Sequence, residues 1–109
     1  MAIADQTTAA ALARKFADLL ADEPAVERIW YLAEPPEAPW ANFDLMIWLQ
    51  VATYDVALVK RIDDVTLRLQ DTHQDVGIGL SVFMLETLPE RNIAYDVDPN
   101  AIEIPLSDR

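Results

Sequence analysis

The 109-residue chain contains no cysteine, a single histidine and only two glycines. The absence of cysteine excludes a disulfide framework, a thiolate zinc site and a cysteine nucleophile. No apolar run approaches the roughly 18 residues that a membrane-spanning helix needs. Near Met1 there is no basic leader followed by an apolar core, so nothing indicates export. These absences predict a cytoplasmic protein that does not cross a membrane.

Positive charge is also scarce. Asp and Glu number 19 against 8 Lys and Arg, which gives a formal net charge of −11. A surface this acidic repels phosphate backbones, so we do not expect nucleic-acid binding. The acids are scattered rather than grouped, which is typical of a solvated surface; a basic protein partner is the alternative. The length and the 52% of hydrophobic residues predict one globular domain over residues 1–109.

The longest nearly continuous apolar stretch runs from Asn42 to Ala52 and contains no Gly or Pro. A run of aromatic and branched residues of this length predicts a strand that is buried on both faces. Asn42 and Asp44 are two residues apart at its start, so their short polar side chains would lie on the same face of the strand. This pair is the first candidate site.

Two amphipathic helices are predicted around this strand, over residues 5–22 and 54–71. Apolar residues recur in both at spacings of three and four, so each helix has one apolar stripe. The first, capped by Asp5, Thr7 or Thr8, carries Ala9, Leu12, Ala13, Phe16, Leu19 and Leu20. The second, with Asp55 as its cap or first-turn acid, carries Leu58, Ile62, Val65 and Leu69.

Further strands are predicted over residues 26–32 and 76–86, and as two short strands about a turn at 93–97 and 101–105. Both glycines lie in the strand at 76–86, where we expect a bulge or the close approach of a neighbouring backbone. The only histidine, His73, precedes that strand. Without a second His, a Cys or an obvious serine partner, its expected role is a surface or capping one.

The order helix, strand, loop, strand, helix, strand resembles the minimal nucleotidyltransferase-like domain of the antitoxin-type nucleotidyltransferases. In that family the first strand ends in an aromatic-Gly-Ser motif, and Ser-Asp-x-Asp-Leu leads into the second. Here Tyr31-Leu32-Ala33 and Ala41-Asn42-Phe43-Asp44-Leu45 stand at those positions. The resemblance covers roughly residues 27–95. It implies an α+β fold, with a mixed sheet of three to five strands packed against two main helices.

The resemblance also implies a magnesium site, built from two carboxylates on one strand and a third on a neighbouring strand. In this sequence Leu32-Ala33 replaces Gly-Ser, Asn42 replaces the first carboxylate, and Ser81 stands where the third is expected. Among the residues expected to form that site, only Asp44 keeps the family's residue type. We therefore interpret Asn42, Asp44 and Ser81 as the remnant of a metal site.

The main prediction is a catalytically inactive nucleotidyltransferase-like domain, with no catalytic residue, metal or cofactor, that acts by binding a protein or itself, as a homodimer in the simplest case. The interface candidates are Trp30, Trp40 and Trp48, because Trp is enriched at binding hot spots. Trp40 follows a proline-rich stretch, and it either folds back over the core or marks an interface.

Two alternatives stay open. One is a weak magnesium-dependent nucleotidyltransferase that uses Asp44 together with Asp75 or Glu86 as metal ligands. The other is a small α+β domain of unassigned role, because a fold without its site says little about function.

Overall fold

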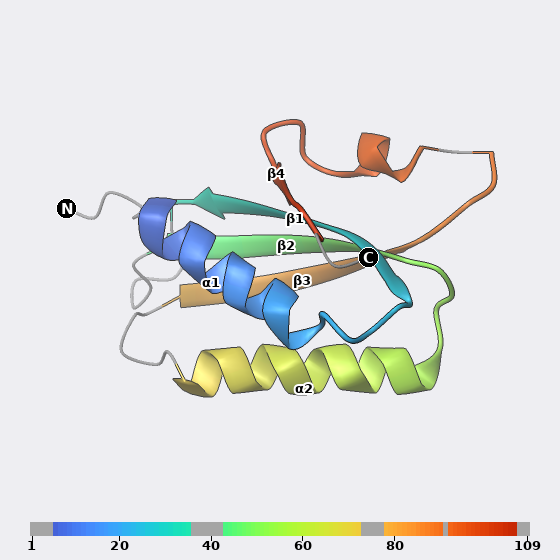
Figure 1. Cartoon of the computed structure of the whole chain (residues 1–109). Helices are drawn as coiled ribbons and strands as arrows, with labels where there is room; N and C mark the ends of the chain where they lie inside the picture. Colours follow the sequence, from blue (N-terminus) through green and yellow to red (C-terminus); the bar gives the residue numbers. More distant parts are fainter. Residues whose placement is uncertain (1–5, 36–42, 73–77, 91, 107–109) are drawn as a thin grey trace.

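A computed structural model describes residues 6–35, 43–72, 78–90 and 92–106. Two helices pack on one face of a four-stranded mixed sheet, which confirms the α+β class predicted from the sequence (Figure 1). The elements, in chain order, are α1 (Gln6–Leu19), β1 (Val26–Glu34), β2 (Phe43–Val51), α2 (Val56–Thr72), β3 (Ile78–Glu86), the short 3-10 helix η2 (Ile93–Asp96) and β4 (Ile102–Ile104). No helix in the described ranges is long and apolar enough to cross a membrane.

The sheet has the strand order β3-β2-β1-β4. Strand β1 runs antiparallel to both β2 and β4, whereas β2 and β3 are parallel and are connected through α2. The apolar run predicted from the sequence is therefore the inner strand β2, flanked on both sides. The two edges of the sheet are β3 and β4.

The sheet face that lies under α1 and α2, here called the helix face, holds the main core. Both apolar stripes predicted for the helices are buried there, apart from the half-buried Leu19. The strands contribute every second residue, as the period of a strand requires. Those from the three long strands are Val26, which a bulge in β1 turns to this face, Ile29, Phe43, Leu45, Ile47, Leu49 and Val51, with Tyr31, Ala33, Leu80, Val82 and Met84 partly buried beside them.

The opposite face, here called the distal face, has a smaller apolar cluster. Trp30 and Trp48 face each other across β1 and β2, and Val97 packs against them. On the distal face, Asp44 and Met46 of β2 are only half-buried. The strand was predicted to be buried on both faces, but it is fully buried only on the helix face.

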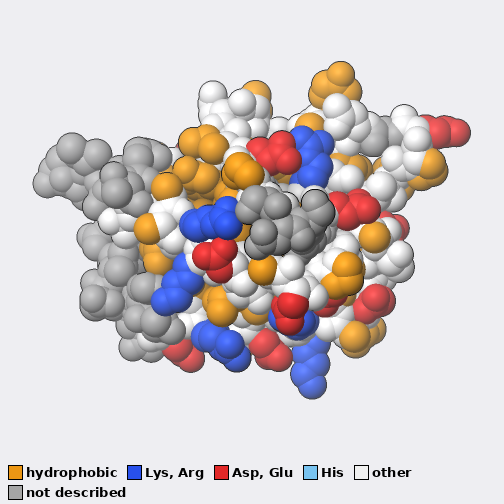
Figure 2. Space-filling model, viewed as in Figure 1, with side chains coloured by type: hydrophobic (Ala, Val, Ile, Leu, Met, Phe, Trp, Pro, Cys, Tyr) orange, Lys and Arg blue, Asp and Glu red, His pale blue; other side chains and the backbone are white. Residues whose placement is uncertain are grey.

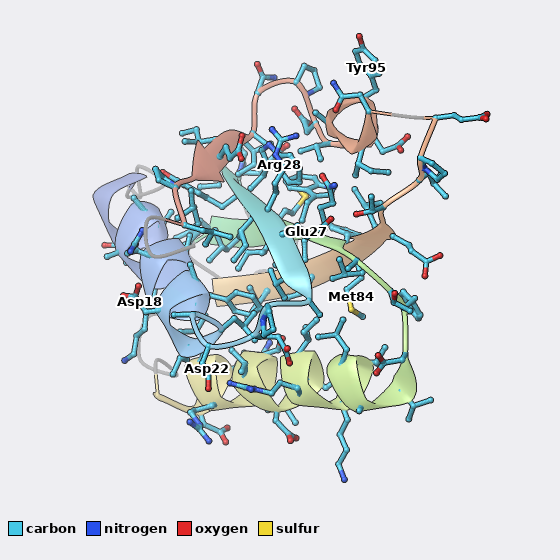
Figure 3. The ribbon with its side chains drawn as sticks, turned by 45° about the vertical axis from the view of Figure 1, so that its right-hand side comes forward. Asp18, Asp22, Glu27, Arg28, Met84 and Tyr95 are labelled. Atoms are coloured by element: carbon cyan, nitrogen blue, oxygen red, sulfur yellow. The ribbon has the colours of Figure 1, made fainter. Side chains whose placement is uncertain are left out.

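Polar contacts hold the helices at their ends. The Asp55 Oδ1 atom accepts a hydrogen bond from the Leu58 backbone N–H at 2.8 Å, which confirms Asp55 as the cap of α2. The Arg61 Nη2 atom lies 2.6 Å from Asp22 Oδ1 and 3.4 Å from the Leu19 carbonyl oxygen. Figure 3 shows Asp22 between the two helices. Arg61 thus ties α2 to the end of α1.

One element was predicted wrongly. Residues 93–97 were expected to form a strand, but residues Ile93–Asp96 form η2. The Asn92 side chain accepts a hydrogen bond from the Ala94 N–H at 3.1 Å, and Asp98 Oδ1 accepts one from the Asn100 N–H at 2.8 Å. Short polar side chains of this kind satisfy backbone donors locally, and this competes with pairing in a sheet.

Candidate functional site

Asp44, the polar residue near the start of β2, lies on the distal face. Asp44 is half-buried and pairs directly with Glu34 on β1 and with Gly79 on β3. Directly opposed residues of an antiparallel pair point to the same face, so the Asp44 and Glu34 carboxylates are neighbours. Glu34 was not recognised from the sequence, because the strand was expected to end at Leu32 and β1 runs two residues further.

Gly79 makes room for Asp44. A Cβ atom added to Gly79 would lie 2.4 Å from Asp44 Oδ1 and 3.3 Å from its Cγ. The sequence predicted that the glycines of this strand allow a bulge or the close approach of a neighbouring backbone. At Gly79 the close neighbour is instead the side chain of Asp44. Gly77, the other glycine, lies outside the described residues.

The structure places Ser81 on the distal face as well. Ser81 pairs with Met46, two residues beyond the Asp44–Gly79 pair, and its side chain is exposed. Asp44 and Ser81 therefore lie on one face of adjacent strands. Asn42, the third member of the predicted remnant, lies outside the described residues.

Glu86, a metal ligand under the enzymatic alternative, lies at the far end of β3. It pairs with Val51, whereas Asp44 pairs with Gly79, so seven residues, or about 23 Å, separate it from the level of Asp44. Its carboxylate accepts a hydrogen bond from the Tyr54 N–H at 2.7 Å. Glu86 cannot share a metal ion with Asp44. Asp75, the other proposed ligand, is outside the described residues.

The described donors near Asp44 do not make up the three-carboxylate magnesium site that the resemblance implies. Across residues 6–35, 43–72, 78–90 and 92–106, no three His, Asp or Glu side chains are grouped closely enough to hold a metal ion. Asp44 and Glu34 supply two carboxylates, and Ser81 contributes a neutral hydroxyl where the third would stand. Magnesium prefers near-octahedral oxygen coordination by carboxylates together with phosphate and water.

Two of the three interface candidates are core residues. Trp30 and Trp48 are only 5% and 9% exposed, because Val97, Ala94 and Ala101 pack over them. The expectation that these indoles anchor a partner is therefore not supported by their placement, since little of either ring is accessible. Trp40 and the isolated His73 lie outside the described residues.

Polar contacts also enclose Trp30. The Arg28 guanidinium lies 4.5 Å from the ring centroid of Trp30 and forms two hydrogen bonds with Glu103, at 2.9 and 2.7 Å. The hydrogen bond with Arg28 holds the pKa of the Glu103 carboxyl below its usual value. The same contact raises the pKa of Arg28. This ion pair joins β1 to β4 and stabilises that edge of the sheet.

A second polar cluster lies at the other end of β2. Gln50 Nε2 donates to Thr87 Oγ1 at 3.1 Å and to Glu27 Oε1 at 3.3 Å, and Thr87 also donates to Glu27. Glu27 lies where the β1–β2 register shifts, at a bulge that lets Val26 face the helices. These contacts fix the chain as it leaves β3.

Strand β3 carries accessible apolar surface. Phe83 is 44% exposed on the distal face, and its ring stacks on Trp48 with centroids 5.6 Å apart. Strand β3 is nine residues long and pairs only with β2 among the described residues. From Ile78 to Leu85 it contains no charged residue and no proline. The strand thus presents an open row of backbone donors and acceptors, without the charges that usually protect an edge.

The other edge, β4, also pairs with one strand and exposes Ile102, but it differs in length, in charge and in its neighbouring proline. Strand β4 has three residues, is followed by Pro105, and carries Glu103 in its centre. The face of the molecule in Figure 2 shows acidic and basic side chains interspersed rather than a large patch of one sign. Within the described residues, β3 is therefore the feature of the sheet most suited to bind another chain.

No family model matches this chain, and searches of curated proteins and of solved structures found no match either. The nucleotidyltransferase resemblance therefore rests on the motifs and on the order of elements along the chain. What it implies for function is a proposal.

Proposed function

We propose that this chain is a catalytically inactive nucleotidyltransferase-like domain that acts by binding protein through the open edge of β3. The observation that carries the proposal is that edge: nine residues long, apolar, and uncharged from Ile78 to Leu85. Long edge strands without charge, proline or bulge pair readily with another strand. A partner strand added to β3 would gain main-chain hydrogen bonds along its length.

The order α1, β1, β2, α2, β3 is the order that the resemblance implies, which supports the scaffold. The inactivity is supported at the start of β2. Asp44 is paired with Glu34, and Ser81 lies two residues along β3 from Gly79, the partner of Asp44 on that strand; among the described residues no third carboxylate joins them, and Glu86 is at the far end of the sheet. The described residues thus supply one carboxylate fewer than the three that the resemblance implies for a magnesium site.

The proposal is tested in two measurements on the full chain. The first is a calorimetric titration with magnesium and ATP, in which we expect no binding heat at millimolar nucleotide. Binding heat that disappears in Asp44→Asn would contradict the inactive reading and favour the enzymatic alternative.

The second measurement asks whether association depends on the β3 edge. Ser81 is exposed on β3, so Ser81→Lys adds a charge to the edge without disturbing the core. Leu67→Lys makes the same change of charge at an exposed position of α2. Sedimentation of the pure chain and affinity chromatography from cell extract should reveal an association, with itself or with another protein, that Ser81→Lys weakens and Leu67→Lys does not. Equal behaviour of the two variants would refute the proposal.

A further inference from the structure

We infer that the chain binding to the β3 edge is a second copy of this protein. In that dimer the two β3 strands pair antiparallel about a twofold axis that passes through the Val82 pair. The inference rests on the proposed function and names the partner for the same edge. It would join two four-stranded sheets into one continuous sheet of eight strands.

Symmetry limits the possible registers. A twofold axis perpendicular to the sheet places the helix faces of both copies on one side of the joined sheet and both distal faces on the other. Each residue must then oppose a residue of the same face, so the axis passes through a pair of identical residues. Val82 is the midpoint of Ile78–Glu86, and the axis at Val82 is the register in which all nine residues of each strand pair.

Side-chain size on the distal face fits this register. Along β3 this face carries two small residues followed by two large ones, in the order Gly79, Ser81, Phe83, Leu85. With the axis at Val82, Gly79 opposes Leu85 and Ser81 opposes Phe83. Each large side chain therefore meets a small one in the other copy. The exposed ring of Phe83 would cover Ser81 of the second copy.

Charge also favours a second copy in this position. No charged side chain lies between Ile78 and Leu85, so the paired strands bring no like charges into contact. The two whole molecules nevertheless repel each other, since each has a net charge of −11. Added salt screens that repulsion and should strengthen the dimer, whereas it would weaken binding of a basic partner.

A stable interface needs a total buried area of about 1,200 Å² or more, so the contact must extend beyond one strand. Helix α2 contacts β3 on the helix face, and Figure 3 shows Met84 on the side of β3 toward that helix. The twofold axis would bring the two copies of α2 side by side. Their facing flank, opposite Arg61 on the helix, carries the half-buried Val59, Thr66 and Gln70, with the exposed Asp63 at its outer rim. Val59 and Thr66 are small enough for two helices to approach to about 10 Å.

The chain contains no cysteine, so single cysteines report the register without background. Opposed residues of antiparallel strands have Cα atoms about 4.5–5.5 Å apart, within the range of a disulfide. We expect Val82→Cys to form a disulfide-linked dimer under mild oxidation. Leu80→Cys alone should not, because residue 80 of each copy would be displaced from its counterpart by four residues, or about 13 Å. Leu80→Cys mixed with Met84→Cys should cross-link, since these positions oppose each other.

Each cysteine variant is checked for a wild-type circular dichroism spectrum. If Val82→Cys fails to fold, Ser81→Cys mixed with Phe83→Cys tests the same register on the distal face. Cross-linking of Leu80→Cys alone at the rate of Val82→Cys would overturn the register, as would the failure of both mixtures.

Sedimentation equilibrium of the pure full chain separates the inference from the proposed function. We expect a dimer whose dissociation constant rises at least about tenfold in Ser81→Lys, is little changed in Leu67→Lys, and falls as salt is added. If the chain is a monomer that binds another protein, and Ser81→Lys abolishes that binding, the inference is overturned and the proposed function stands. A monomer with no edge-dependent partner overturns both, and a dimer that Ser81→Lys leaves unchanged overturns the β3 interface.

Discussion

Replacing Gly79 with alanine tests the contact that sets the start of β2 against β3. The added Cβ would lie 2.4 Å from Asp44 Oδ1, whereas carbon and oxygen atoms in contact are normally separated by about 3.5 Å. The Asp44 carboxylate must therefore move by about 1 Å, or the two strands must separate. Overpacking of this kind costs about 1–3 kcal/mol.

Part of this cost is recovered in the unfolded state, because alanine has less backbone freedom to lose than glycine. That gain is about 0.4–1 kcal/mol where the native backbone conformation suits alanine. The net expectation for Gly79→Ala is a loss of about 1–2 kcal/mol in the free energy of unfolding. For a chain of this size, the melting temperature should fall by about 4 °C per kcal/mol.

A double-mutant cycle isolates the contact. In an Asp44→Ala background the oxygen atom is gone, so Gly79→Ala should become neutral or stabilising by about 0.5 kcal/mol. Urea unfolding of the four proteins measures the coupling, expected at about 1–2.5 kcal/mol. Ser81→Ala, at an exposed position of the same strand, is the matched control and should stay within about 0.5 kcal/mol of wild type. An equal cost of Gly79→Ala in both backgrounds would refute the steric explanation.

Three further predictions concern stability. The folded pKa of Glu103 lies below its unfolded value of about 4.3, so its stabilisation is complete above that pH and is lost as pH falls through the folded pKa. The ion pair between Glu103 and Arg28 is partly exposed, so Glu103→Gln should lower the free energy of unfolding by less than about 1 kcal/mol. In urea titrations, this difference from wild type should shrink below about pH 4. A difference that stays constant with pH would contradict the pairing. Asp55→Ala removes the cap that accepts the Leu58 N–H and should cost about 1 kcal/mol in urea unfolding, whereas Asp55→Asn should retain most of it. Ile47→Ala, fully buried in the central strand, should cost about 2–5 kcal/mol by the same measurement, and a cost under 1 kcal/mol would show that the core is assigned wrongly.

The helices and the central strand could be predicted because each is specified by its own local pattern. In α2, Leu58, Ile62 and Leu69 recur at the helical period, and one helix face is enough to decide which of its residues are buried. The apolar run of β2 likewise indicates a strand with neighbours on both sides. These features depend on the spacing of residues and not on which elements meet.

The arrangement of the sheet could not be predicted in this way, because it depends on contacts between distant segments. Nothing near Glu34 indicates that it pairs with Asp44, since that follows from the register of β1 against β2. Trp30 and Trp48 are equally consistent with an interface or a core until Val97, far along the chain, is seen to pack over them. The edge position of β3 is of the same kind, because it follows from the strand order alone.

The unequal edges of the sheet explain why pairing through β3 should end at two copies. A sheet with two open edges could add chains without limit, as in cross-β assemblies. Here β4 offers only three residues, and Pro105, which follows it, has no N–H to donate. Glu103, at its centre, is held by Arg28 and keeps a charge at that edge. If the two β3 strands pair as proposed, the edges that remain are the two copies of β4, so the assembly would close as a dimer with twofold symmetry.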